Sequence, residues 1–111
     1  MKVEKIHNGI RYTLSNEDIK AGDKVYPIAR GRCLDDGEWI FHNLDYGEYC
    51  SGFPNEPHTI LDIKNSDYKP SEVHTDMGFS PIECYYKIIK KEHQVSDGRK
   101  MFPIYKWIEI E

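Results

Sequence analysis

The sequence lacks any apolar run that approaches the roughly 20 consecutive residues needed to cross a bilayer. Its first residues, MKVEKIHNGIRYTL, interrupt apolar side chains with charged ones, so they have no continuous apolar core of the kind found in signal peptides. We therefore expect a soluble protein of the cytoplasm that makes no contact with membranes.

Motifs that mark common enzyme classes are also absent. The chain contains no GxGxxG, GxxxxGKS/T, GxSxG or HExxH pattern and no closely spaced pair of cysteines. Dinucleotide binding, P-loop chemistry, nucleophile-elbow hydrolysis and zinc fingers therefore have no support from sequence. The pattern indicates no cofactor, and it favours a protein that is not an enzyme without deciding the question.

Cysteine is scarce. Cys33, Cys50 and Cys84 are odd in number and widely spaced, which does not suit a disulfide framework, and we expect all three thiols to be reduced. Cys84 has apolar neighbours in IECYYK. Burial there would raise its pKa and suppress nucleophilicity, so we predict a thiol packed in the core.

What is present suits one folded domain spanning residues 1–111. Hydrophobic residues make up 39% of the chain and aromatic residues 13%, which argues against disorder. A chain of this length buries about two-thirds of its unfolded surface without a metal or a disulfide.

Charge is segregated along the chain. Residues 1–32 hold seven basic and four acidic side chains, residues 33–84 two and eleven, and residues 85–111 six and four. No Lys or Arg occurs between Arg32 and Lys64. Such a layout bears on partners and solubility rather than on fold, and the acidic middle would repel duplex nucleic acid.

Strand patterns dominate the first half. Segments 2–7 and 10–14 flank Asn8-Gly9, which predicts a type I′ hairpin. Ser15 and Asp18 resemble a capping box, with Gly22 as a stop, so we expect one helical turn there. A strand over 24–34 follows, in which Pro27 favours an edge or a bulge. A turn at 35–38, a strand at 39–44 and a long loop at 45–57 complete this half.

Segments 58–64 and 71–76 predict a second hairpin. If Leu61, Ile63, Val73 and Thr75 share the buried face, Ile63 pairs with Val73 and Leu61 with Thr75. That register places Asp62 opposite His74. His58, Ile60, Asp62, His74 and Asp76 then share the other face.

Residues 80–91 are ambiguous between helix and strand. Ser80, Pro81 and Glu83 suit the start of a helix, whereas the following YYKII favours a strand. We expect a short helix that gives way to strand near Tyr86, then a turn over 93–100 and a final strand at 101–111. The predicted fold is mainly β: a small barrel or a strongly bent antiparallel sheet, with one or two short helices.

Residues 19–32, IKAGDKVYPIARGR, are similar to the first strand of small SH3-like barrels, in which a Gly-Asp turn precedes a Val-rich strand. The short chain as a whole resembles many small proteins of phages and mobile elements. The likeness implies a fold only, and it transfers no residue role.

The function that the sequence favours is a binding module that presents an acidic, tyrosine-containing loop face to a basic surface of a protein partner. Tyrosine supplies contact area at low entropic cost. The predicted partner-binding residues are Asp35, Asp36, Glu38, Asp45, Tyr46, Glu48, Tyr49, Phe53 and Glu56.

Two alternatives from other classes remain. One is a metal-dependent enzyme built on His58, Asp62, His74 and Asp76, whose nitrogen and oxygen ligands would suit Zn, Mn or Fe(II). On that face an ordinary solvated sheet surface is the favoured interpretation. The other alternative is a small-ligand-binding barrel. The sequence does not indicate the oligomeric state.

Overall fold

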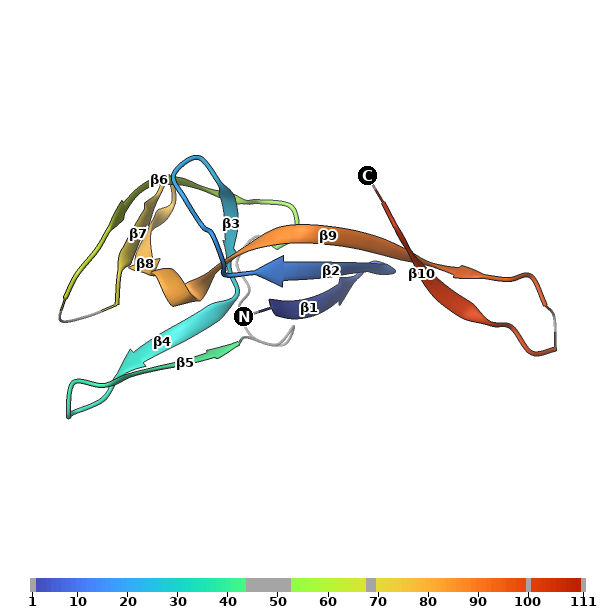
Figure 1. The fold of residues 1–111 in the computed structure, drawn as a ribbon, viewed down its shortest axis with the longest axis horizontal. Coiled ribbons are helices and arrows are strands. Elements are labelled where there is room, and N and C mark those ends of the chain that lie inside the picture. The colour runs from blue at the N-terminus through green and yellow to red at the C-terminus, as the bar shows by residue number, and fades with distance from the viewer. Residues whose placement is uncertain (1, 44–52, 68–69, 100, 111) are drawn as a thin grey trace. The chain divides into compact units, whose positions relative to one another are not determined.

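The computed structural model describes residues 2–43, 53–67, 70–99 and 101–110 (Figure 1). The chain divides into two compact units. The first contains residues 1–15 and 88–111, and the second contains residues 16–87. Strand β9 (Tyr85–Ser96) belongs to both, because it begins in the second unit and continues into the first.

The first unit begins with a hairpin of β1 (Lys2–His7) and β2 (Ile10–Ser15). The two strands are antiparallel, in a register that runs from Lys2 opposite Ser15 to His7 opposite Ile10. Asn8 and Gly9 have φ values of 51° and 77°, as a type I′ turn requires at both positions. The predicted hairpin is confirmed.

The rest of this unit is a second hairpin. The later part of β9 pairs antiparallel with β10 (Tyr105–Glu109), from Ser96 opposite Tyr105 to Glu92 opposite Glu109. Glu92 is only 6% exposed, and such burial requires a partner for its charge. Arg11 supplies it, donating from Nε and Nη2 to Glu92 Oε1 at 3.1 and 3.0 Å, while its guanidinium lies 4.6 Å from the ring centroid of Trp107.

The second unit contains an antiparallel sheet with the strand order β3-β6-β7-β8. Its strands are β3 (Lys24–Pro27), β6 (His58–Lys64), β7 (Glu72–Thr75) and β8 (Gly78–Pro81). The other edge of β3 pairs with the first residues of β9. The core is a cluster of Val25, Ile60, Val73 and Tyr85, each at most 3% exposed. Burial of apolar surface in this cluster drives folding of the unit.

A separate two-stranded ladder completes the second unit. Strand β4 (Ala29–Cys33) pairs antiparallel with β5 (Trp39–Asn43), from Ala29 opposite Asn43 to Cys33 opposite Trp39. Pro27 ends β3, and the next backbone N–H, that of Ile28, donates to Cys84 O at 3.0 Å. The predicted strand over 24–34 is therefore two strands that separate after the proline, which has no N–H for the ladder.

The only helical element in the part of the chain that the structure describes is a 3-10 turn, η1 (Ile82–Cys84). Asn16 fixes it, because its side-chain Nδ2 donates to the carbonyl oxygens of Ile82 and Tyr85 at 2.8 and 2.7 Å. The predicted switch from helix to strand is found one residue early, at Tyr85. Ser80 is not the cap: its hydroxyl donates to Phe79 O, and η1 has no side-chain cap.

The helical turn predicted from Ser15 to Asp18 is wrong. Ser15 ends β2 and is buried, and Asp18 has a φ of 57°, which lies outside the right-handed helical region. The final strand predicted at 101–111 is shorter than expected, since β10 begins at Tyr105. The turn predicted at 93–100 starts later, because β9 runs to Ser96.

The predicted register of β6 and β7 is half right. Asp62 lies opposite His74 and Ile63 opposite Val73, but Thr75 pairs with Ile60 and not with Leu61, because the register shifts between Ile60 and Asp62. A bulge of this kind sends the extra residue out of the ladder. Ile60 is accordingly buried at 1% exposure and Leu61 is 62% exposed. The predictions that Leu61 is buried and that Ile60 lies on the opposite face are therefore both wrong.

The mainly β prediction is confirmed, and the described strands pair antiparallel throughout. The strands of the described residues do not close into a barrel. The turn at Gly22-Asp23 does precede β3, with Asp23 N donating to Lys20 O at 3.1 Å. The SH3-like assignment stays a prediction. Among the described residues, no helix is long and apolar enough to cross a membrane.

Candidate binding site

The β4–β5 hairpin has two chemically different faces. Because side chains alternate along a strand, the pairs Gly31–Phe41 and Cys33–Trp39 lie on one face, and the pairs Arg30–His42 and Arg32–Ile40 on the other. One face is therefore aromatic and the other largely basic.

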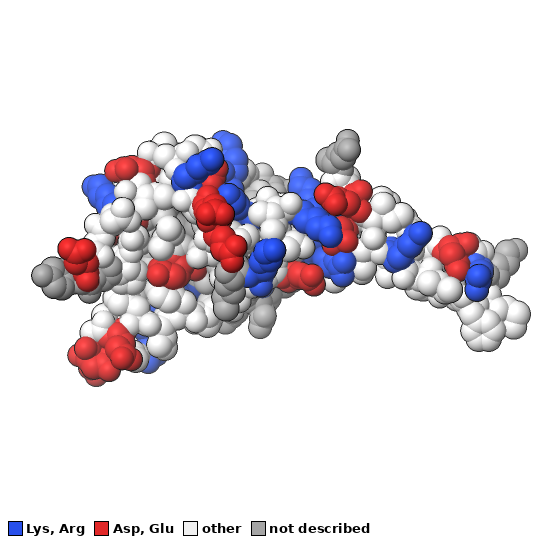
Figure 2. Space-filling model, viewed as in Figure 1, with Lys and Arg blue, Asp and Glu red and all other residues white. Residues whose placement is uncertain are grey.

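The turn of this hairpin is acidic. Asp35, Asp36 and Glu38 are exposed there, and Figure 2 shows red atoms gathered at the tip of the β4–β5 hairpin. The turn is ordered by backbone bonds, with Leu34 N donating to Glu38 O at 2.7 Å and Gly37 N to Leu34 O at 3.0 Å. Asp36 Oδ1 accepts from Glu38 N at 3.0 Å. Within the described ranges, none of the three carboxylates forms an ion pair.

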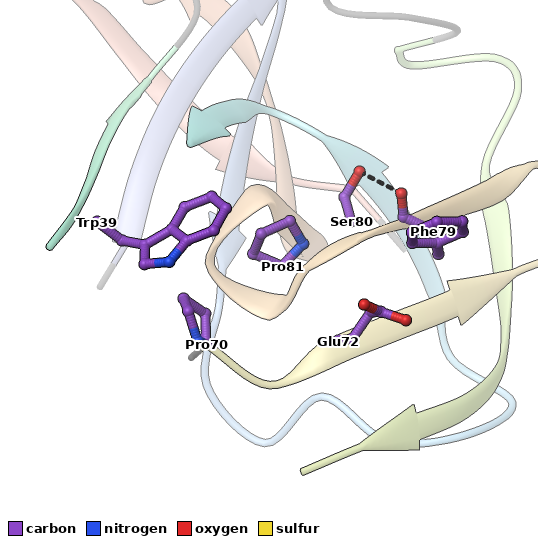
Figure 3. A pocket seen from close by; sticks show the side chains of 6 residues that line it. All are labelled: Trp39, Pro70, Glu72, Phe79, Ser80 and Pro81. Carbon is purple, nitrogen blue, oxygen red and sulfur yellow. Dashed lines mark hydrogen bonds between the residues drawn. The ribbon is translucent and has the colours of Figure 1, made fainter. Parts of the chain in front are cut away.

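A cavity of about 240 Å³ opens beside the aromatic face of the hairpin (Figure 3). Trp39 contributes one wall from the start of β5, and the loop before β7 and strand β8 contribute the others. The remaining lining residues are Pro70, Glu72, Phe79, Ser80 and Pro81. The indole of Trp39 lies next to the rings of Pro70 and Pro81. The walls are thus mostly apolar, with one carboxylate among them.

Backbone pairing explains why residues from β7 and β8 meet at this cavity. Glu72 is the Cα partner of Pro81, and Val73 that of Ser80. Ile82 N extends the ladder by donating to Ser71 O at 2.8 Å. Pro81 ends β8 in an extended conformation, with φ −55° and ψ 146°, so its ring lies at the rim where the sheet stops.

Gly31 and Phe41 position Trp39. The two residues are directly opposite each other, and the Phe41 ring lies so close over Gly31 that an added Cβ would be 2.4 Å from Phe41 Cε1. Phe41 in turn stacks on Trp39, with ring centroids 6.1 Å apart and an interplanar angle of 13°. An aromatic side chain that covers a strand glycine in this way fills the space left by the missing side chain.

Glu72 and Phe79 are held by His74. The His74 ring stacks on Phe79 at a centroid distance of 5.2 Å and an angle of 16°, as expected for Cα partners. His74 Nε2 also contacts Glu72 Oε1 closely. The carboxylate is therefore fixed in place at the cavity wall.

The predicted partner-binding residues are only partly accounted for. Asp35, Asp36 and Glu38 cluster at the hairpin turn, and Glu56 is exposed. Phe53 packs edge-on against Tyr26 at 5.1 Å, and the Tyr26 hydroxyl donates to Pro54 O at 2.9 Å. Asp45, Tyr46, Glu48 and Tyr49 lie outside the described residues, as does most of the loop predicted at 45–57.

The four His and Asp residues considered as metal ligands take separate roles. Asp62 Oδ1 accepts from Ile63 N and Asp76 Oδ1 from Thr59 N, both at 2.9 Å, while His74 contacts Glu72 and Phe79. His58 Nδ1 is buried and has no hydrogen-bond partner among the described residues, and its ring lies 6.1 Å from that of Tyr85. Across residues 2–43, 53–67, 70–99 and 101–110, no group of three or more His, Cys, Asp or Glu could hold a metal ion.

Cys84 is packed as predicted. It is 5% exposed, and burial raises the pKa of its thiol above the ordinary value of 9.0, against a smaller opposing effect of a hydrogen bond to the Gly31 backbone. The neutral thiol is therefore favoured. Cys33 is exposed.

Sequence reasoning missed the cavity. Its residues come from three places in the chain. Trp39 was predicted only as the first residue of a strand, and Phe79 fell between two predicted elements. Two prolines near strands, Pro70 and Pro81, were the available signal, because proline at the end of an edge strand leaves an apolar ring at the rim.

Comparison with known proteins gives no relative from which a role could be taken: no family model, no curated protein and no solved structure matches the chain.

Proposed function

We propose that the protein is a non-enzymatic binding module that takes up a basic, partly apolar segment of a protein partner at the cavity beside Trp39 and the acidic turn of the β4–β5 hairpin. One observation carries the proposal: an exposed cluster of three carboxylates directly precedes the strand whose first residue lines an apolar cavity.

The charge of the second unit supports a basic partner. Residues 16–87 contain seven Lys or Arg and fourteen Asp or Glu, a net charge of −7, whereas the whole chain has −4. Charge complementarity of this kind accelerates association and selects the partner. Arg30 and Arg32 reduce the negative charge near the acidic turn, but alternation along β4 places them on the face opposite Trp39.

The cavity favours a side chain over a free small molecule. At about 240 Å³ it falls below the roughly 300–1,000 Å³ of sites for drug-sized ligands. Tryptophan and proline rings form rigid apolar walls, and Glu72 offers a carboxylate to a neighbouring Lys or Arg. Tryptophan is also among the residues that most often dominate binding energy at protein interfaces.

The proposed setting is the cytoplasm. The support is the scarcity and wide spacing of the cysteines, which suits a reducing compartment. The small size and the absence of common enzyme motifs also suit an accessory protein of a phage or mobile element, and the proposal includes that origin.

The test is selection from a random peptide library, with the full chain as bait. We expect enriched peptides to combine Lys or Arg with a neighbouring apolar residue, and recovery to fall as salt is raised, because salt screens exposed charges. A triple variant, Asp35→Asn, Asp36→Asn and Glu38→Gln, removes the charges at nearly constant volume. It should weaken binding of basic peptides.

A second variant of the site and one matched control make the result decisive. Phe79→Ser truncates an exposed wall of the cavity and should also weaken binding. Leu61→Ser removes an equally exposed apolar side chain on β6, away from the cavity lining, and should leave binding unchanged. Enrichment that is insensitive to both the triple variant and Phe79→Ser would refute the proposed site.

A further inference from the structure

A second exposed apolar feature lies in the first unit. Figure 1 shows the loop that joins β9 to β10. This loop and the first residue of β10 expose large apolar side chains to water. They are Met101 at 83%, Phe102 at 77%, Ile104 at 55% and Tyr105 at 58% exposure. Soluble monomers rarely leave several large apolar side chains together in water unless the patch binds something. We call these four residues the arm tip.

The loop that carries the arm tip is closed by a network at its base. Asp97 Oδ1 accepts from Arg99 N at 3.0 Å and from Ile104 N at 3.4 Å, and Asp97 Oδ2 pairs with Arg99 Nε at 3.2 Å. Asp97 N donates to Ile104 O at 3.0 Å. Because these bonds already order the base of the loop, less conformational entropy is lost on docking than for a free segment.

The charge around the arm tip is opposite to that of the cavity. Residues 1–15 and 88–111 together hold eight Lys or Arg and five Asp or Glu, a net charge of +3, against −7 for residues 16–87. Arg99 and Lys106 flank the arm tip in sequence, whereas Glu72 lines the cavity and three carboxylates precede Trp39.

The volume of the cavity is large enough for an aromatic side chain of the arm tip. A cavity of about 150 Å³ with apolar walls is large enough for benzene, and the cavity beside Trp39 has about 240 Å³. It can therefore take a phenyl ring such as that of Phe102. Aromatic residues also form favourable edge-on or offset pairs with one another, and Trp39 and Phe79 are both available in the walls.

We propose that the partner of this cavity is a second copy of the chain, whose arm tip inserts Phe102 beside Trp39. This inference rests on the proposed function and names its partner. The contact is heterologous, because it joins two different surfaces of the same protein. Association therefore needs one intact arm tip and one intact cavity, and the two need not lie on the same molecule.

The test is analytical ultracentrifugation of the full chain and of variants over a range of protein and salt concentrations. The wild type should associate more strongly as its concentration rises and less strongly as salt rises. Phe102→Ser should weaken association at least about 30-fold, as truncation of a central interface residue does. Phe79→Ser, at the other side of the contact, should do the same. Ile6→Ser removes an exposed apolar side chain of β1 (54% exposed) and should change nothing.

Mixing the two variants is the decisive part of the experiment. Phe102→Ser retains an intact cavity and Phe79→Ser retains an intact arm tip, so a mixture of the two should associate more strongly than either variant alone. A chain that stays monomeric at every concentration overturns the inference, and so does a mixture that fails to recover association. Binding of the arm to anionic lipid vesicles, lost in Phe102→Ser while the chain stays monomeric, would also overturn it. In all three cases, peptide selection at the cavity still tests the proposed function independently.

Discussion

The contact between Gly31 and Phe41 leads to the most specific prediction for the candidate site. In Gly31→Ala the new Cβ would lie 2.4 Å from Phe41 Cε1 and 2.8 Å from Cδ1. Ordinary contacts begin near 3.4 Å, so the ring has to move by about 1 Å and its stacking on Trp39 changes. Overpacking of this kind typically costs about 1–3 kcal/mol.

The cost of overpacking is partly offset by the higher preference of alanine for a strand. The two effects can be measured separately, because only the overpacking depends on Phe41. Alanine is favoured over glycine within a strand by about 0.5–1 kcal/mol. Gly31→Ala should therefore lower the free energy of unfolding by about 0.5–2 kcal/mol when Phe41 is present. In a Phe41→Ala background nothing opposes the new methyl group, and the same substitution should raise stability by about 0.5–1 kcal/mol.

Urea denaturation followed by circular dichroism measures the four free energies of this double-mutant cycle. The expected coupling is about 1–3 kcal/mol. A second cycle with Ile40→Ala is the control, because Ile40 lies on the opposite face of β5, and its effects should add to those of Gly31→Ala. Additivity within about 0.5 kcal/mol in the Phe41 cycle would show that the ring does not depend on the glycine.

Three further predictions concern stability. Asn16→Asp replaces a donor to two backbone carbonyl oxygens by a carboxylate and should lower the free energy of unfolding by at least about 2 kcal/mol. Asn65→Asp keeps the acceptor that Asn65 uses and should be nearly neutral in the same urea assay. Arg11→Ala leaves the buried carboxylate of Glu92 without its main partner and should cost about 3 kcal/mol, far more than loss of an exposed ion pair. Burial raises the pKa of Cys84, so the stabilisation from its neutral thiol is complete below about pH 9 and is lost as pH rises through the folded-state pKa. Unfolding curves should show a weaker alkaline loss in Cys84→Ala.

Much of the fold follows from local sequence. Asn8-Gly9 specifies a hairpin because few other dipeptides accept positive φ twice, and the pairing of Asp62 with His74 follows from side-chain alternation. The error at Leu61 has a definite cause. A bulge reverses the alternation of every residue before it, and no turn or proline marks its position.

The helical turn at Ser15 fails for a different reason. A capping pattern predicts a helix only where the following residues can use it. Here Asn16 donates to the carbonyl oxygens of Ile82 and Tyr85, more than sixty residues away. The acidic turn at Asp35 to Glu38 was predicted because the positions of acidic residues are read directly from the sequence. The cavity beside it was not, since it depends on the pairing of Glu72 with Pro81.

The most direct test of the binding site compares two indole signals in one sample. Trp39 and Trp107 are the only tryptophans, and they lie in different units, so the Nε1–H resonance of Trp107 is an internal control. A peptide of residues 97–106, DGRKMFPIYK, is titrated into the 15N-labelled full chain carrying Phe102→Ser, at low salt. The Trp39 indole resonance should shift with saturable dependence on peptide while that of Trp107 stays. A basic peptide selected from the library should do the same. If neither peptide moves the Trp39 resonance, or if both indoles move together, the cavity is not the binding site.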